Sequence, residues 1–297
     1  MKAKQYAINL PVQDYDLDAT LISGQAFGWE NGVMGWTGVV AGRWVQLSRD
    51  AIGIYARTMA DPGDWNWLRD FLQTEVVLAE VLRSFPEDDE HLRRAVASCR
   101  GLRLLRQEPW ECLASFILSS TKQIVQIRQI VRLLRERFGT PVVVPEGWPP
   151  TFAFPTAAQI AVLSEAELRS CKMGFRAPYL LAAARRVHAG EIDLAAIGRM
   201  ELFAAQQELL RFAGVGEKIA DCVLLFAYGF PTAFPVDVWV RRVLVDYYFR
   251  GRSVKELRLR RFIEQHFGAN AGYAQQYLFH HIRTKDGKNL SPTRVAA

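Results

Sequence analysis

Lys218 is placed where an amine can act as a nucleophile. It follows Ala213-Gly214-Val215-Gly216 and lies in the first turn of a helix predicted to begin near Glu217. The positive end of a helix dipole disfavours a protonated amine, and a neutral amine can attack a sugar carbon. Nineteen residues further on, Asp237 lies just after a proline in Phe234-Pro235-Val236-Asp237-Val238, at a second predicted helix start. A carboxylate near the amine can stabilise positive charge that develops on a sugar.

Residues 209–228 predict two helices joined by a tight hairpin. Gly214 and Gly216 flank Val215, so the backbone can turn sharply and its amides can approach a phosphate. We therefore interpret these three residues as a sequence-independent contact to a nucleic-acid backbone. The alternative is an ordinary turn between helices, with Asp237 serving only as a helix N-cap. The hairpin, the helix-start lysine and the Pro-Val-Asp segment together favour the first interpretation.

Positive charge is concentrated near the end of the chain. Residues 241–297 hold twelve Lys or Arg and four Asp or Glu, whereas residues 1–240 hold 25 and 27, and the net charge of the 297 residues is +6. A basic face attracts an anionic polymer such as DNA, because phosphate neutralisation supplies most of the non-specific affinity. A basic stretch that is only a solvated surface is the alternative.

The composition argues against several classes of protein. No run of roughly 18 apolar residues occurs, so neither secretion nor membrane insertion is expected. The expected location is cytoplasmic, and nucleoid-associated if the chain is bacterial. The four cysteines are too far apart for a CxxC metal site or for the loop that holds an iron–sulfur cluster, so reduced thiols and no cluster are expected at Cys99, Cys112, Cys171 and Cys222.

Strand patterns come first along the chain and helix patterns follow. Four short β-rich runs predict a small antiparallel sheet: QYAINL, GWTGVV, RWVQLS and IGIYAR. Asp64 is the expected N-cap of a helical segment through about Ser84. Pro109 stands at a predicted first helical turn, residues 140–156 form a proline-rich connection, and Ser164 with Glu167 forms a capping box. An apolar stripe that stops at Gly139 predicts a further helix through Ile124, Ile127, Val131 and Leu134.

The predicted fold class is therefore α+β. A small N-terminal antiparallel β-sheet domain with flanking helices occupies residues 1–100. A mainly α-helical domain follows at residues 101–297, and its helix-hairpin-helix motif lies at about residues 203–228.

Residues 209–241 resemble the helix-hairpin-helix DNA glycosylases that carry a Gly/Pro-rich loop and a catalytic Asp, and Lys218 matches their bifunctional members. Over nearly its whole length the chain resembles the 8-oxoguanine DNA glycosylase/AP lyase family. The further matching segments are Ser23-Gly24-Gln25-Ala26-Phe27-Gly28-Trp29, Leu104-Leu105-Arg106-Gln107, Pro109-Trp110-Glu111-Cys112, Met173-Gly174-Phe175-Arg176-Ala177 and Ala271-Gly272-Tyr273-Ala274-Gln275.

The resemblance implies a role for each matched residue. Lys218 attacks the anomeric carbon, displaces the damaged base and forms a Schiff base whose β-elimination nicks the strand, while Asp237 stabilises the charged sugar. The nucleotide is flipped out of the duplex first. The carbonyl of Gly24 then accepts a hydrogen bond from the proton that oxidised guanine carries and guanine lacks. The flipped base is sandwiched by Cys222 and Phe279, and its pairing edge is contacted by Gln275. Core packing is the alternative for each pocket residue.

The resemblance also implies contacts to the DNA and a cation. Phe175 takes the place of a wedge beside the vacated site, and Arg176 contacts the opposite strand. Carbonyls in the hairpin, those of Leu210, Phe212 and Val215, can hold a structural cation against a phosphate. No cofactor is required. The implied partner is double-stranded DNA that contains a damaged base, with no membrane involved, and the expected state is a monomer.

Several positions depart from the family pattern. Ser119-Ser120-Thr121-Lys122-Gln123 stands where the family's eukaryotic enzymes carry asparagines, so Thr121 is a candidate contact to the base opposite the lesion and the opposite-base preference is open. Gly28 replaces an arginine, Phe175 a tyrosine, and Trp239 a histidine.

Two other functions compete with this interpretation. One is a glycosylase for alkylated bases, whose hairpin lacks the lysine. The other is a non-catalytic DNA-binding module, which needs neither Lys218 nor Asp237.

Overall fold

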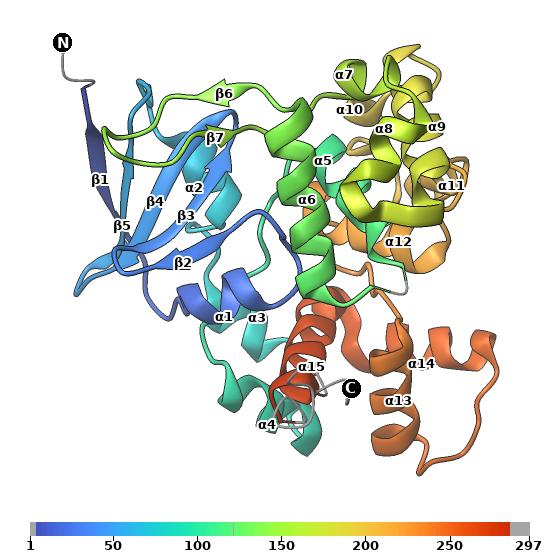
Figure 1. The fold of residues 1–297 in the computed structure, drawn as a ribbon. Coiled ribbons are helices and arrows are strands. Elements are labelled where there is room, and N and C mark those ends of the chain that lie inside the picture. Colours follow the sequence, from blue (N-terminus) through green and yellow to red (C-terminus); the bar gives the residue numbers. More distant parts are fainter. Residues whose placement is uncertain (1–3, 121, 286–297) are drawn as a thin grey trace, which may run out of the picture.

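The computed structural model describes residues 4–120 and 122–285, and the N-terminal part forms one antiparallel sheet (Figure 1). The strand order is β1-β5-β4-β3-β2, and the register pairs Leu10 with Ile54 and Leu47 with Ala56. All four predicted strands are present, together with a short strand, β2, that the sequence pattern did not indicate. The strands are β1 Tyr6–Pro11, β2 Glu30–Gly32, β3 Gly35–Val40, β4 Arg43–Arg49 and β5 Gly53–Thr58.

Four helices lie in this part of the chain. Helices α1 Leu17–Ile22 and α2 Asn66–Leu72 pack into the core of the sheet, whereas the buried residues of α3 Leu78–Arg83 and α4 Glu90–Ser98 belong to the core of the helical part. The prediction of one helical segment from Asp64 to about Ser84 was wrong. The N-cap of α2 is Trp65, at φ 63°, and its C-cap is Gln73, at φ 55°, so left-handed residues bound a short helix. Neither residue type signals a left-handed conformation, because non-glycine residues seldom adopt it. Asp64 instead accepts a hydrogen bond from the amide of Asn66 at 2.9 Å.

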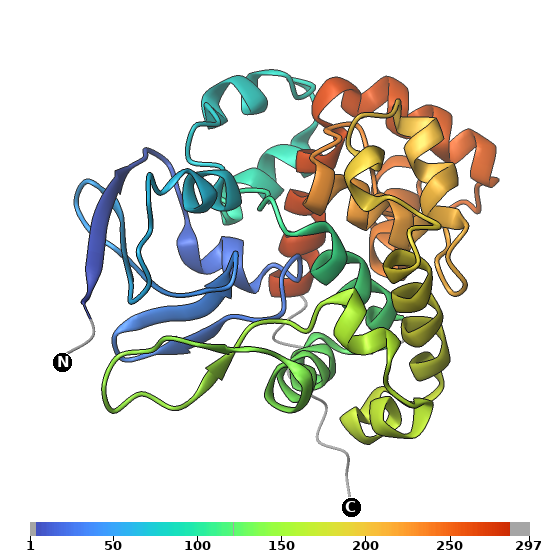
Figure 2. The same ribbon diagram turned by 90° about the horizontal axis from the view of Figure 1, so that it is seen from above.

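The rest of the described chain is mainly helical, as the fold-class prediction required (Figures 1 and 2). Its elements are α5 Pro109–Ser119, α6 Ile124–Phe138, α7 Ala157–Ala161, α8 Glu165–Leu168, η1 Arg169–Met173, η2 Gly174–Arg176, α9 Ala177–His188, α10 Leu194–Ile197, α11 Leu202–Leu210, α12 Glu217–Val223, η3 Leu224–Tyr228, α13 Val238–Tyr248, α14 Glu256–Phe267, η4 Gly268–Asn270 and α15 Ala271–Lys285. Pro109 begins α5, and the capping box at Ser164 and Glu167 begins α8, as predicted.

The connection between α6 and α7 is more ordered than the sequence indicated. Residues 140–156 contain a two-stranded hairpin of β6 Pro141–Val142 and β7 Thr151–Phe152. The hairpin loop reaches back to the sheet, where the ring of Trp148 meets that of Trp44 edge-on at 5.1 Å. No helix in the described part of the chain is both long and apolar enough to span a bilayer.

Two helices join the N-terminal and helical parts. Helix α5 runs through the interior, and eight of its eleven residues are buried. Helix α15 packs against α4 on one side and α13 on the other (Figure 1). Residues 23–29, which follow α1, therefore lie against elements from the middle and the end of the chain. The contacts of this loop, which we call the selection loop, are described below.

Candidate active site

The hairpin between α11 and α12 has the predicted tight geometry. The amide of Val215 donates to the carbonyl of Phe212 at 3.1 Å. Gly214 has φ 80°, and a Cβ there would lie 2.8 Å from the ring of Tyr179, so both conformation and space require glycine. Gly216 is the N-cap of α12 and supplies no side chain to the first helical amides. The exposed backbone of residues 214 and 216 therefore suits an anionic group from outside.

Lys218 lies in the first turn of α12, half-buried beneath the hairpin. Its Nζ donates to Ser119 Oγ at 3.4 Å and lies 5.4 Å from the centre of the Phe116 ring. The Ser119 hydroxyl in turn donates to the carbonyl of Phe116 at 2.7 Å, which leaves its oxygen to accept from the amine. No sequence pattern indicates this contact, because Ser119 lies 99 residues from Lys218.

Cys222 lies one helical turn after Lys218 and is buried. Burial raises the pKa of its thiol to about 12, while Lys218, which hydrogen-bonds to the thiol, lowers it and Asp221 and Asp237 raise it. The thiol is therefore neutral near pH 7 and serves as a small apolar surface rather than as a nucleophile. Lys218 and Asp237 both influence this one side chain, so the two residues lie on the same side of the molecule as Cys222.

Asp237 is the N-cap of α13, as the simpler interpretation proposed. Its Oδ1 accepts a hydrogen bond from the amide of Val240 at 2.8 Å. The carboxylate is half-buried, and a cap uses one of its two oxygens. Asp237 also influences Arg283. Burial lowers the pKa of that guanidinium, and the nearby carboxylate of Asp237 partly opposes this effect by raising the pKa. The N-cap interaction fixes the carboxylate in place and leaves its second oxygen for another partner.

Gly24 and Phe279 lie together, as expected for a pocket. Gly24 has φ 86°, and a Cβ there would lie 2.7 Å from Ile124 Cδ1 and 3.4 Å from Phe279 Cε1. Gln275 lies one turn before Phe279 on α15, so the two side chains share a helix face. Gln275 is 4% exposed, and its Oε1 has no hydrogen-bond partner in the described structure. A buried amide oxygen without a partner is costly, and a bound polar group would satisfy it.

Arg283 also lies beside Gly24 and Phe279, and it was not predicted from the sequence. It continues the face of Gln275 and Phe279 by one more turn, and its guanidinium lies 5.2 Å from the centre of the Phe279 ring. Its Nη1 donates to the carbonyl of Ser23 at 3.3 Å, beside Gly24. The spacing of four residues along α15 was the available signal.

Phe175 and Arg176 have different environments. Phe175 is 58% exposed and projects from η2, as a wedge must, whereas Arg176 is 2% exposed. The guanidinium of Arg176 lies 4.2 Å from the centre of the Phe175 ring. The buried guanidinium therefore makes a cation–π contact that helps to hold the exposed ring in place. A direct contact of Arg176 with the opposite DNA strand stays a prediction.

The remaining expected contacts are less defined by the structure. Thr121 lies outside the described residues. The carbonyl of Phe212 already accepts from Val215, and a cation at the carbonyls of Leu210, Phe212 and Val215 stays a prediction. No cluster of three or more His, Cys, Asp or Glu suited to a metal ion occurs in residues 4–120 and 122–285.

Two models of known protein families match this chain. The model for the N-terminal domain of 8-oxoguanine DNA glycosylase matches residues 7–113. The model for the HhH-GPD superfamily base excision DNA repair protein matches residues 114–267, and so includes the hairpin, Lys218 and Asp237. This chain belongs to the HhH-GPD superfamily.

Three proteins illustrate how similar this HhH-GPD protein is to its relatives. It is 34% identical over 214 residues to a Methanothermobacter thermautotrophicus protein named "Probable N-glycosylase/DNA lyase", covering 66% of this chain and 68% of the relative. It is 28% identical to "N-glycosylase/DNA lyase OGG1" of Arabidopsis thaliana, covering 93% and 80%. The solved structure of Clostridium acetobutylicum 8-oxoguanine glycosylase/lyase, bound to double-stranded DNA containing cytosine opposite 8-oxoG, superposes with a TM-score of 0.86 at 28% identity, covering 92% of this chain and 93% of that one.

Proposed function

We propose that this HhH-GPD protein is a base excision DNA glycosylase with AP lyase activity, which removes 8-oxoguanine from duplex DNA through Lys218. The carrying observation is the half-buried amine at the start of α12, held by Ser119 and directly after a hairpin that exposes backbone amides. A DNA-binding module needs no amine at that place. The names of the relatives support the same activity.

The amine is the nucleophile of the proposed reaction. The lone pair of Lys218 Nζ forms a bond to C1′ of the sugar, and the bond from C1′ to the base nitrogen breaks with its electrons leaving on the base. Loss of a proton from nitrogen, cleavage of the C1′–O4′ bond and uptake of a proton by O4′ give the imine. Loss of a C2′ proton then breaks the C3′–O bond, expels the 3′ phosphate and nicks the strand, and water hydrolyses the imine to free Lys218. Asp237 lowers the barrier of the first step, because its charge opposes the positive charge that builds up on the sugar.

The base pocket supplies selection. The flipped base is proposed to lie between Phe279 and Cys222, where the neutral thiol offers an apolar face. The unpartnered Oε1 of Gln275 accepts from its pairing edge. The carbonyl of Gly24 accepts a hydrogen bond from the N–H found on 8-oxoguanine and absent from guanine, and an unmodified guanine would leave that acceptor unsatisfied at a cost of roughly 1–3 kcal/mol.

The proposed partner is one damaged DNA duplex per monomer, with no cofactor. The backbone of residues 214–216 binds a phosphate, where the hairpin carbonyls of Leu210, Phe212 and Val215 can add a cation, and Phe175 enters the space of the flipped nucleotide.

Trapping with borohydride tests the proposal against its two alternatives. The protein is incubated with duplexes that carry 8-oxoguanine, an alkylated base or no lesion, and borohydride is added. A covalent complex with the 8-oxoguanine duplex, absent in Lys218→Gln, is the expected result. Release of an alkylated base without trapping would indicate the alkylation-repair function, and binding without reaction would indicate a DNA-binding module.

A further inference from the structure

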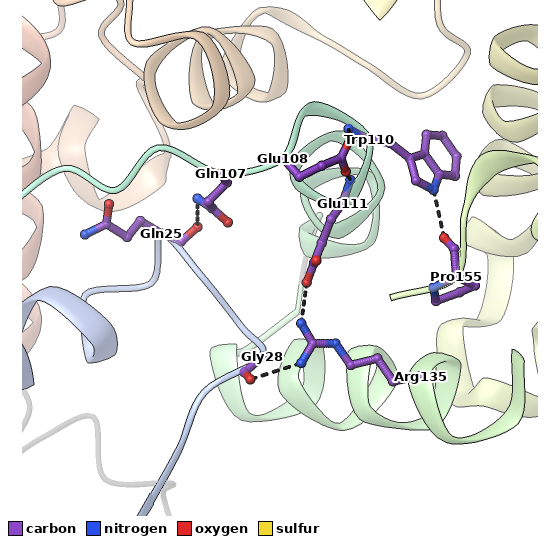
Figure 3. A network of polar contacts seen from close by, with 8 residues as sticks. All are labelled: Gln25, Gly28, Gln107, Glu108, Trp110, Glu111, Arg135 and Pro155. Carbon is purple, nitrogen blue, oxygen red and sulfur yellow. Dashed lines mark hydrogen bonds and ion pairs between the residues drawn. The ribbon is translucent and has the colours of Figure 1, made fainter. Parts of the chain in front are cut away.

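The selection loop, residues 23–29, is held at Ser23 by donors from α15 and at two further points by the segment before α5 and by α6 (Figure 3). The first is Gln25, directly after Gly24. The side-chain amide of Gln107 donates to the carbonyl of Gln25 at 2.7 Å, and the side-chain carbonyl of Gln25 accepts from the amide of Leu105 at 2.7 Å. These bonds fix the beginning of the loop against the segment that precedes α5.

The second point is Gly28, and it depends on one side chain of α6. Arg135 Nη1 donates to the carbonyl of Gly28 at 3.1 Å, and its Nη2 donates to Glu111 Oε1 of α5 at 2.6 Å (Figure 3). The side chains of Arg135 and Glu111 are 12% and 28% exposed, so water screens this ion pair less than it screens a pair on the surface. One guanidinium therefore joins the loop to both α5 and α6.

Gly28 and Arg135 are shaped for each other. A Cβ at position 28 would lie 2.4 Å from Arg135 Nη2, so any larger residue would displace the guanidinium. The same glycine was a departure in the sequence, because it stands where the resembling family carries an arginine. In this chain the guanidinium of Arg135, on α6, packs against Gly28 instead.

We propose that Arg135 is a positioning residue for lesion selection. By holding Gly28 it fixes the path of the selection loop, so that the carbonyl of Gly24 stays directed at the flipped base. The inference rests on the proposed function. It assigns to Arg135 no contact with DNA and no part in the chemistry of Lys218, so base excision should depend on it and the nicking of an abasic site should not.

The test compares two reactions in matched variants. Excision from an 8-oxoguanine duplex and nicking of a preformed abasic duplex are measured under single-turnover conditions, together with Tm. Arg135→Ala should lower the ratio of excision to nicking by about tenfold, since sub-ångström misplacement has effects of that size. The control is Arg132→Ala, on the same helix, where an exposed ion pair with Glu136 is lost. It should leave the ratio within about twofold.

Two further variants separate positioning from stability. Arg135→Lys keeps the charge but not the planar fork, so it should recover Tm more fully than the excision ratio. Gly28→Ala displaces the guanidinium and should lower the ratio by itself, yet add little in the Arg135→Ala background, where the new methyl group has space. This non-additivity is the signature of one shared contact.

The outcomes distinguish the two levels of the argument. An active wild-type protein whose ratio is unchanged in Arg135→Ala overturns the role of Arg135, and so do equal losses of excision and nicking. A wild-type protein that neither excises 8-oxoguanine nor is trapped overturns the proposed function, and the positioning role with it.

Discussion

The start of α12 and the base pocket are built in different ways. The backbone around Lys218 comes from one contiguous stretch, the hairpin and the helix that follows it, while its amine contacts Ser119 and Phe116 of α5. The pocket combines the selection loop with α15, and the contact from Arg283 to Ser23 spans 260 positions. In the proposed reaction, local structure sets the backbone position of the nucleophile, whereas recognition of the base relies on the docking of distant segments. Variants should separate the two, with changes near Lys218 affecting both reactions and changes in the pocket affecting excision.

Asp237→Asn should give the largest effect after loss of the nucleophile. Asparagine can still accept from the amide of Val240, so α13 keeps its cap and the fold and DNA affinity are retained. Excision should slow by about 100-fold, because the lost charge acts in the transition state. Single-turnover rates and DNA binding measured on the same preparation check this. Loss of affinity in parallel with rate would reduce Asp237 to a structural N-cap.

Gln275→Ala should slow base excision more than it slows the nicking of an abasic site. Removal of the buried amide takes away an acceptor for the base and leaves Lys218 untouched. We expect excision of 8-oxoguanine to fall about tenfold more than nicking of a preformed abasic site. Equal losses on both substrates would contradict the assignment of Gln275 to the pocket.

Ser119→Ala should have a smaller effect, and it should affect both reactions alike. The hydroxyl orients the amine through a single 3.4 Å contact, so a loss of about threefold in excision and in nicking is expected. Borohydride trapping yield measured against time gives the rate of imine formation directly. A loss confined to excision would move Ser119 from the nucleophile to the pocket.

Asp221→Asn should change stability and leave both reactions nearly unaffected. Burial raises the pKa of Asp221 from 3.8 to about 6, against the lowering effect of its hydrogen bond from Gln206. A raised carboxyl pKa means that the folded state binds the proton more tightly, so stability is lost as pH rises from about 4 through 6.

The asparagine variant avoids this loss. Its unfolding free energy should exceed that of the wild type by about 2 kcal/mol at pH 8 and match it at pH 4. Urea unfolding at the two pH values measures the difference. A less stable variant at pH 8 would show that the carboxylate is favoured in the folded state.

The sequence predicted most accurately where structure is local. Glycine spacing, a capping box and an apolar stripe located the hairpin, α8 and α6, because each pattern acts within a few residues. The break between α2 and α3 was missed, since the left-handed conformations of Trp65 and Gln73 are imposed by their surroundings. The proposed domain boundary at residue 100 stays a prediction; the two family models meet after residue 113, inside α5.

Within the site, the same contrast holds. Lys218 and Asp237 could be proposed from spacing alone, and the resemblance supplied Gly24, Gln275 and Phe279. Contacts between residues far apart in the sequence, such as those of Ser119 and Arg283, could not be found, because they depend on how helices pack.

The docking of α15 also sets the order in which this protein becomes competent during synthesis. The carbonyl of Ser23 accepts hydrogen bonds from Gln276 and Arg283, which are synthesised some 250 residues later. A nascent chain can therefore form the hairpin around Lys218 before it has a complete pocket. The proposed base pocket is therefore completed last, when the final described helix packs against one of the first loops synthesised.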